Sequence, residues 1–186
     1  MIVAKAPVRE RILEAATRRY YAEGIRAVSA DRLIADAGIS KVTFYRYFAS
    51  KDDLVVAYLE QASAREKDGV TAERAKGDPS AVLRWYADSV GAMSCAPGFR
   101  GCPFINAAAE IADPKHPGRR IVTEHRAWLT AQATELLTEM NVERAEARAE
   151  QLMMLRDGAM IAGYLGRKPE DVAASLMAAG RAVIGR

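Results

Sequence analysis

Two short helical patterns separated by only three residues constrain this chain more than any other feature. The segment SADRLIADAGISKVTFYRYF holds one helical pattern over residues 30–37 and a second over residues 41–47, joined by Gly38-Ile39-Ser40. Serines at positions 29 and 40 are suited to cap the two helices. Two short helices joined by a tight turn form a helix-turn-helix, provided that suitable residues occupy the turn.

Three residues of the segment meet the requirements of that turn. Ala35 is expected to be small because the helices cross closely there. Gly38 accepts a left-handed backbone without a Cβ clash, and Ile39 is expected to fill the space between the helices. The rest of a small core is expected from Leu33, Ile34, Phe44 and Phe48, together with Ile12, Ala16 and Tyr20 of the preceding helix.

The second short helix is left with an outer face of basic, polar and aromatic residues. A helix of this width fits the major groove of DNA, where its N-terminal residues meet base edges. Tyrosine hydroxyls suit phosphate oxygens, and the free backbone N–H groups at the start of the next helix favour an anion. We therefore expect contacts to double-stranded DNA from Lys41, Val42, Thr43, Tyr45, Arg46, Tyr47 and Lys51.

The distribution of charge agrees with an anionic partner at this end of the chain. The 186 residues carry a net charge of +3, but residues 1–51 hold ten basic and five acidic side chains, so they carry +5 and the remainder carries −2. A basic excess confined to one segment is typical of nucleic-acid binding. A helix-turn-helix pattern alone is weak evidence, since helical bundles contain many such corners, and a helical interaction protein is the alternative.

The whole chain has an all-α pattern. Alanine, leucine, arginine and glutamate are abundant, whereas alternating Val, Ile and Thr runs are scarce. Glycine and proline mark the breaks between helices. We expect about nine helices, over residues 7–23, 30–37, 41–47, 51–76, 80–93, 104–112, 119–140, 142–165 and 169–184.

The segment AGISKVTFYRYFASKDDL closely resembles the DNA-binding signature of the TetR family of bacterial transcriptional regulators. The resemblance covers about residues 7–58, and Val42 departs from it, because many members have glycine there. Carried over by position, the resemblance implies DNA contacts at Lys41, Thr43, Tyr45, Tyr47 and Lys51. Arg46 is added from its chemistry alone.

The resemblance also implies the organisation and the function of the chain. We expect a helix-turn-helix domain over residues 1–50 and a helical ligand-binding and dimerisation domain over residues 51–186. The chain is then a ligand-responsive repressor that binds a palindromic operator as a homodimer and is released by a small-molecule inducer. An activator, or an interaction protein without an inducer, is the alternative.

Two sets of residues in the second domain are candidates for ligand binding and for dimerisation. Bulky and polar side chains suited to a ligand pocket are Trp85, Met93, Phe104, Asn106, Glu110, His125, Trp128 and Met153, with Tyr164 as a further apolar candidate. Ordinary packing is the alternative, because a methionine or aromatic stripe at helical spacing is usually part of the core. The residues expected at the dimer interface are Leu152, Arg156, Ala159, Met160, Gly163, Leu176, Ala179 and Val183.

Other classes of function find little support in the sequence. The chain has no glycine-rich phosphate loop, H-E-x-x-H helix or G-x-S-x-G elbow, so we expect neither an enzyme nor a cofactor. Cys95 and Cys102 are expected to be reduced thiols, with a redox switch as a minor alternative. The cysteines and histidines lack zinc-site spacing, and a metal site from Glu110, Asp113, His116 and His125 is a minor alternative.

The sequence also predicts the compartment. No apolar run approaches the roughly 20 residues that a membrane-spanning helix needs. The N-terminal segment MIVAKAPVRERILEAA meets charged residues too early for a secretory signal. We expect a cytoplasmic protein with no membrane partner.

Overall fold

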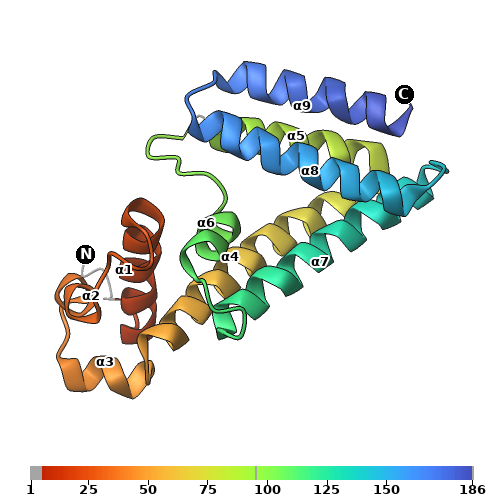
Figure 1. Ribbon diagram of the computed structural model, residues 1–186. Helices are drawn as coiled ribbons and strands as arrows, with labels where there is room; N and C mark the ends of the chain where they lie inside the picture. The colour runs from red at the N-terminus through yellow and green to blue at the C-terminus, as the bar shows by residue number, and fades with distance from the viewer. Residues whose placement is uncertain (1–5, 95, 186) are drawn as a thin grey trace, which may run out of the picture. The chain divides into compact units, whose positions relative to one another are not determined.

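The computed structural model describes residues 6–94 and 96–185, and within that part the chain forms nine helices and no strand (Figure 1). The all-α class expected from the sequence is confirmed. The helices are α1 (Val8–Glu23), α2 (Ala30–Ala37), α3 (Lys41–Tyr47), α4 (Lys51–Arg74), α5 (Pro79–Ser94), α6 (Pro103–Glu110), α7 (Pro117–Glu139), α8 (Ala145–Tyr164) and α9 (Pro169–Ile184).

The start of α8 differs most from the predicted boundaries. The sequence suggested a helix from Val142, but α8 begins at Ala145. Asn141 and Arg144 both adopt positive φ angles, of 56° and 55°. A left-handed residue interrupts a right-handed helix, because its backbone cannot continue the i to i−4 hydrogen-bond pattern. Helical propensity over residues 142–144 is therefore overridden by the turn between α7 and α8.

The chain divides into two compact units. Unit 1 comprises residues 1–63 and 103–122, and unit 2 comprises residues 64–102 and 123–186. These units do not follow the boundary expected after residue 50. Unit 1 adds the first half of α4 and all of α6 to the helix-turn-helix segment, so its core draws on residues far apart in the sequence.

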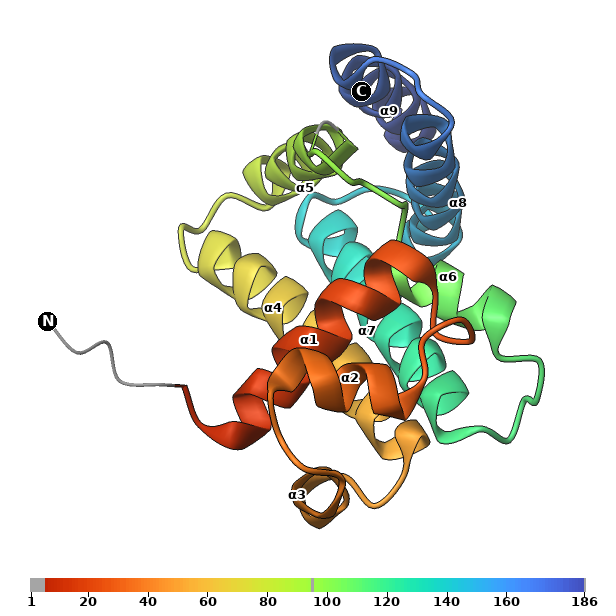
Figure 2. The ribbon, with the colours of Figure 1, turned by 90° about the vertical axis from the view of Figure 1, so that its left-hand side faces the viewer.

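Unit 1 is held together by a small aromatic and aliphatic core. Ile12 and Ala16 of α1, Leu33 of α2 and Phe44 of α3 have no exposed surface, and Leu54 of α4 is equally buried. The spacing of Ile12, Ala16 and Tyr20 places them on one side of α1, and Tyr20 packs edge-on against Tyr58 of α4 at 5.7 Å. In Figures 1 and 2, α3 lies at the lower end of this unit, with α1 and α2 above it.

Unit 2 is built from α5, α8 and α9 with parts of α4 and α7. Contacts between α9 and α8, between α9 and α5, and between α5 and α8 join these three helices, which lie together in Figure 1. At the α7–α8 end, Leu137 and Ala149 are fully buried in a cluster with Met140 and Val142. The end of α4 is fixed to α7 through Arg74, whose guanidinium lies 2.6 Å from Glu139.

Candidate functional site

The turn between α2 and α3 has the geometry expected of its glycine. Gly38 adopts the left-handed region, with φ of 61° and ψ of 50°. Its N–H donates to the Ala35 carbonyl at 3.0 Å, and the Ile39 N–H donates to the Ile34 carbonyl at 3.3 Å. This pair of bonds is a Schellman motif, which satisfies the last carbonyls of α2 and turns the chain sharply.

Packing around the turn differs from the expectation at one position. Ala35 is exposed, so it does not lie at the close crossing of the helices, whereas Ala37 is buried. The end of α2 is closed instead by Arg11 of α1. Its guanidinium donates to the Ala37 carbonyl and, at 3.0 Å, to the Gly38 carbonyl. A cation at a helix C-terminus is favourable, so α1 fixes the turn from outside the two short helices.

Serines cap the starts of α3 and of α4, the next helix in the chain. Ser40 Oγ accepts a hydrogen bond from the Thr43 N–H at 3.1 Å and lies 2.8 Å from the Thr43 hydroxyl. At the start of α4, the Asp53 N–H donates to Ser50 Oγ and the Ser50 N–H donates to the Asp53 carboxylate, both at 3.0 Å. These reciprocal bonds form a capping box, so α3 is bounded by two satisfied helix starts.

The face of α3 opposite Phe44 is exposed. Val42 is 82% exposed, although it is an apolar residue, while Tyr45 and Tyr47 are 43% and 40% exposed. The Tyr45 ring packs edge-on against the buried Phe44 at 5.3 Å, so contact with the core fixes the position of the ring. An exposed valine on a short, capped helix next to half-exposed tyrosines is a surface suited to the major groove.

The basic side chains around α3 are partly ordered by neighbours. The Arg46 guanidinium lies over the Tyr47 ring at 5.3 Å. The Lys41 ammonium lies 3.3 Å from the Asp31 carboxylate, and the side chains of Lys41 and Asp31 are mostly exposed. Lys51 differs from these two, because its Nζ donates to the Ile25 carbonyl at 2.6 Å. Burial lowers the pKa of Lys51. One of its three donors is therefore committed inside unit 1.

A carboxylate of α6 holds the loop between α1 and α2. Glu110 Oε2 accepts the Arg26 N–H at 2.8 Å. Gly24, with φ of 94°, lies so close that a Cβ there would be 3.0 Å from each Glu110 carboxylate oxygen. Together with the bond from Lys51 to Ile25, the bond from Arg26 ties two consecutive residues of the loop to α4 and α6, and Gly24 lies beside them. The loop between α1 and α2 is therefore set by side chains remote in sequence.

A buried ionic cluster lies in unit 2, between α4, α5, α7 and α8. His125 Nε2 and Glu66 Oε2 are 3.2 Å apart, and the Tyr86 hydroxyl donates to Glu66 at 2.6 Å. Burial alone would raise the pKa of Glu66, but hydrogen bonds from His125 and Tyr86 and the charge of Arg156 bring it below its usual value. Glu66 is therefore a carboxylate, and burial raises the pKa of Tyr86, which stays a neutral phenol.

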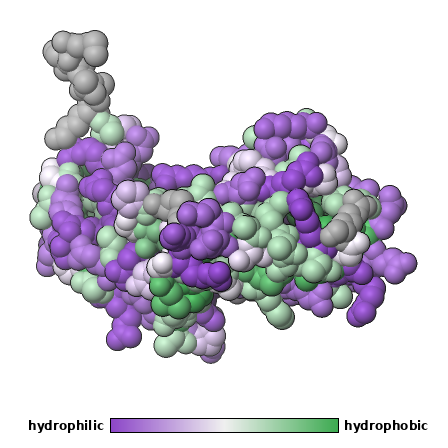
Figure 3. Space-filling view, turned by 90° about the horizontal axis from the view of Figure 1, so that it is seen from above, coloured by the Kyte–Doolittle hydropathy of each residue, from purple (hydrophilic) through white to green (hydrophobic). Residues whose placement is uncertain are grey.

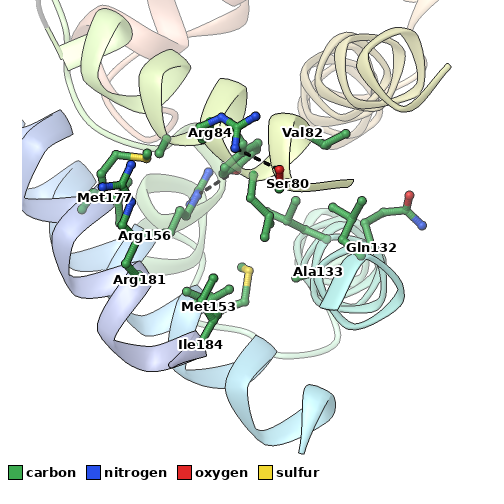
Figure 4. Close-up of a pocket in the computed structure, with 18 of the residues that line it drawn as sticks. Ser80, Val82, Arg84, Gln132, Ala133, Met153, Arg156, Met177, Arg181 and Ile184 are labelled. Atoms are coloured by element: carbon green, nitrogen blue, oxygen red, sulfur yellow. Dashed lines mark hydrogen bonds between the residues drawn. The ribbon is translucent and has the colours of Figure 1, made fainter. Parts of the chain in front are cut away.

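Next to this cluster, unit 2 has a half-open cavity of ≈ 460 Å³ (Figure 4). Its walls are mainly aliphatic and come from α5, α7, α8 and α9, with Val70 of α4. Such a size and composition are typical of small-molecule sites. The lining residues are Val70, Ser80, Val82, Leu83, Arg84, Tyr86, Ala87, Leu129, Gln132, Ala133, Leu136, Met140, Leu152, Met153, Arg156, Leu176, Met177, Gly180, Arg181 and Ile184.

Comparisons with known proteins decide the family. The family model for bacterial regulatory proteins of the tetR family matches residues 12–58, which contain the helix-turn-helix. A TetR-family transcriptional regulator from Streptomyces coelicolor, known as a crystal structure, is 43% identical, with a TM-score of 0.89 over 95% of this chain and 94% of that chain. The chain belongs to the TetR family.

Two further relatives agree with this assignment, one by sequence over part of the chain and one by fold. The uncharacterized HTH-type transcriptional regulator YvkB from Bacillus subtilis (strain 168) is 35% identical over 72 residues. That match covers 39% of this TetR-family chain and 37% of YvkB, little more than a third of its length. The regulatory protein TetR from Rhodobacter sphaeroides shares the fold, with a TM-score of 0.82 at 22% identity over 94% of this chain and 97% of that chain.

As a member of the TetR family, the chain is a transcriptional regulator with a DNA-binding helix-turn-helix, and the family is not one of enzymes.

Within the described helices, none is both long and apolar enough to span a bilayer. In the same part of the chain, no three His, Cys, Asp or Glu side chains are close enough together to hold a metal ion. Glu110, Asp113, His116 and His125 therefore do not form such a group. Cys95 lies outside the described residues, and Cys102 is a buried free thiol.

The residues expected around a ligand do not form one site in this TetR-family chain. Of the eight, Met153 lines the cavity. His125 belongs to the ionic cluster and packs against Trp128 at 5.6 Å. Trp85 lies against Gly69, where a Cβ would be 3.0 Å from its ring, and Met93 is 45% exposed. Phe104, Asn106 and Glu110 belong to unit 1.

The expected dimer residues lie mostly on the inner face of unit 2. Arg156, Met160 and Gly163 are buried within the chain itself, and a Cβ at Gly163 would be 2.6 Å from Ser94 Oγ. Leu152, Arg156 and Leu176 line the cavity. The α8 residues among these lie on a face of α8 that contacts α5 and α9 of the same chain. Leu152, Ala159, Leu176, Ala179 and Val183 are only partly exposed.

The contact between Glu110 and the α1–α2 loop can be tested directly. We expect Glu110→Ala to accelerate amide hydrogen exchange at Arg26 several-fold, because an unpaired N–H loses about 1 kcal/mol of local protection. Glu110→Gln keeps an acceptor oxygen and should give a smaller increase. Hydrogen exchange followed by NMR measures both, with Glu60→Ala, an exposed glutamate of α4, as the control. Unchanged exchange at Arg26 in Glu110→Ala would contradict the assignment.

Proposed function

We propose that this protein is a repressor whose dimer binds a palindromic operator through α3 and is released by a small-molecule inducer. One observation supports DNA reading above the others: Val42, Tyr45 and Tyr47 are exposed on a helix whose opposite side, at Phe44, is fully buried. Lys41, Thr43 and Arg46 complete this face. At the edge of the face, Lys51 has two N–H donors left after its bond to the Ile25 carbonyl. The face thus offers both base-edge and phosphate contacts.

Phosphate contact by Lys41 is tested by the salt dependence of binding. We expect Lys41→Met to reduce the slope of log affinity against log salt by about 1, because one fewer counterion is released. Loss of the exposed ion pair to Asp31 should not disturb folding, since such pairs contribute little. Fluorescence anisotropy on a labelled duplex measures the slope. Lys76→Met, an exposed lysine of unit 2, is the control and should leave the slope unchanged.

Support for a dimer comes from apolar residues left uncovered on α8 and at its C-cap, Leu165. Met154 is 69% exposed, Ile161 43%, Tyr164 46% and Leu165 76%. Gly158 lies in the same stripe, and a Cβ there would have nothing within 4 Å. Glycine inside a helix costs about 1 kcal/mol, and a close approach by another helix is a physical reason to keep it. Figure 3 shows hydrophobic residues gathered between hydrophilic ones on the face seen from above.

This face replaces the inner stripe as the proposed dimer surface. A twofold dimer would present two copies of α3 to half-sites about 34–36 Å apart, or a multiple of that distance. We expect Ile161→Glu to shift the protein to monomers in sedimentation velocity, because it buries a charge at the interface. Ala127→Glu, at an exposed position of α7, should remain dimeric. A dimer that survives Ile161→Glu unchanged would rule out this surface.

The cavity of unit 2 supports the proposal of an inducer. Both α4 and α7 contribute residues to the two compact units, and α4 follows α3 directly in the chain, so α4 is a covalent route between cavity and DNA-binding helix. A coupling of about 1–3 kcal/mol would change operator affinity by 5- to 150-fold. The test is a titration of operator affinity against ligand, and a ligand that binds the cavity without changing operator affinity would contradict the inducer role.

A further inference from the structure

The cavity of unit 2 has charged groups of one sign. Three of its lining residues are arginines, Arg84, Arg156 and Arg181, and none of the residues that line it is an aspartate or glutamate. The close-up shows Arg156 and Arg181 with Met177 on one side of the cavity, opposite Gln132 and Ala133 (Figure 4). The remaining lining is almost entirely aliphatic, so the cavity has an apolar body and a cationic side.

Arg156 is the most informative of the three, because its side chain is only 7% exposed and yet lines the cavity. Its Nε donates to the Tyr86 hydroxyl at 3.2 Å, and its Nη1 lies 3.2 Å from Cys102 Sγ and 3.1 Å from Asp157. Its Nη2 is 3.9 Å from Glu66, beyond hydrogen-bond distance. Within the described part of the chain, the two Nη2 donors therefore have no acceptor.

The other two arginines differ in how far their charge is neutralised. Arg84 donates to Ser80 Oγ at 2.9 Å and lies 3.3 Å from the Asp78 carboxylate, so it is already paired. Arg181, on the last turns of α9, is exposed and has no ion pair with any described residue. Uncommitted guanidinium donors thus occur on two residues of the cavity lining, Arg156 and Arg181.

We propose that this cavity binds an apolar molecule that carries one carboxylate, with the carboxylate held by Arg156 and Arg181 and the apolar body against α5, α7 and α8. Planar guanidinium groups match carboxylate geometry, and such charge-assisted bonds are about twice as strong as neutral ones. The proposal names the ligand class of the inducer site and so rests on the proposed function. A cationic ligand would face the guanidinium of Arg181, unpaired among the described residues, beside the ion-paired Arg84 and Arg156. A neutral ligand would leave the Nη2 donors of Arg156 unpaired.

The proposal is tested with three probes that share one tail. Decanoate, 1-decanol and decylamine present an anionic, a neutral and a cationic head on the same apolar chain. Isothermal titration of the full-length protein at neutral pH is expected to show decanoate binding about tenfold more tightly than decanol, which corresponds to a single good charged contact. Decylamine is expected to bind more weakly than both. Equal binding of decanoate and decanol, tighter binding of decylamine, or no binding of decanoate would overturn the proposal.

Substitutions at Arg181 locate the head group. Arg181→Met keeps an apolar side chain at an exposed position and is expected to reduce the preference for decanoate over decanol several-fold, with decanol affinity unchanged. Arg181→Lys should restore part of that preference. Arg167→Met, at an exposed arginine that does not line the cavity, is the control and should behave as the unmodified chain. A preference that survives Arg181→Met in full would overturn the assigned head-group position.

Operator affinity is measured with the same ligands, because the two measurements together separate the ligand class proposed here from the inducer role. If decanoate binds preferentially and operator affinity stays constant, the ligand class stands and the inducer role fails. If a neutral ligand binds preferentially and weakens operator binding, the inducer role stands and the ligand class fails.

Discussion

Replacing Phe44 with alanine is expected to destabilise unit 1 by about 3–5 kcal/mol, because it removes a large, fully buried ring. Phe44 is the side chain that connects α3 to the core, and it packs against Phe48 at 6.3 Å and Tyr45 at 5.3 Å. A loss of this size is a large fraction of the stability of a small domain. We therefore expect α3 to lose its fixed position and DNA affinity to fall by more than tenfold.

Hydrogen exchange with mass spectrometry separates this effect from changes elsewhere. Peptides from α1, α2 and α3 should exchange much faster in Phe44→Ala, while peptides from α8 and α9 keep their protection. Val42→Ala, on the same helix but 82% exposed, should leave exchange in unit 1 unchanged. Native-like protection of α3 in the Phe44→Ala protein would show that the core does not depend on this ring.

Replacing Arg156 with methionine is expected to destabilise unit 2 by about 2–4 kcal/mol, because it leaves the carboxylates of Glu66 and Asp157 with less compensation. The estimate is below that for a fully buried pair, since these two side chains are 22% and 24% exposed. Asp157 also keeps Arg126 at 2.6 Å, so most of the loss should arise at Glu66. Urea unfolding followed by circular dichroism measures the change.

A double variant identifies the cause of that loss. Adding Glu66→Gln to Arg156→Met removes the uncompensated charge. The double variant should therefore be at least about 1 kcal/mol more stable than Arg156→Met, because the effects of substitutions at contacting residues are not additive. Arg84→Met, which removes an exposed pair near the same cavity, should cost less than about 1 kcal/mol. If the double variant is no more stable than Arg156→Met, the ionic cluster is not the source of the effect.

The helix-turn-helix was predictable from the sequence because its signals are local. Gly38 lies three residues after Ala35, and the capping serines Ser40 and Ser50 each lie three residues before the N–H groups they accept. Short-range hydrogen bonds of this kind require only the right residue at a fixed offset. The exposed face of α3 followed from the same periodicity, once Phe44 was placed in the core.

The roles of Glu110 and Arg156 depend on long-range packing that no local pattern records. Glu110 accepts a hydrogen bond from a residue 84 positions away, and this contact fixes the α1–α2 loop. Arg156 belongs to an apolar stripe of α8 that a second copy or the same chain could cover, and periodicity does not distinguish the two. A charged residue inside an apolar stripe was the available signal for a buried cluster or a ligand site.

Selection of bound duplexes from a random pool tests the central claim most directly, because it requires the outer face of α3 to read base edges from two subunits at once. We predict that the full-length protein enriches a twofold-symmetric sequence whose half-site centres are about 34–36 Å apart or a multiple of that distance. Enrichment of a site without twofold symmetry, or of no sequence at all, would contradict the account.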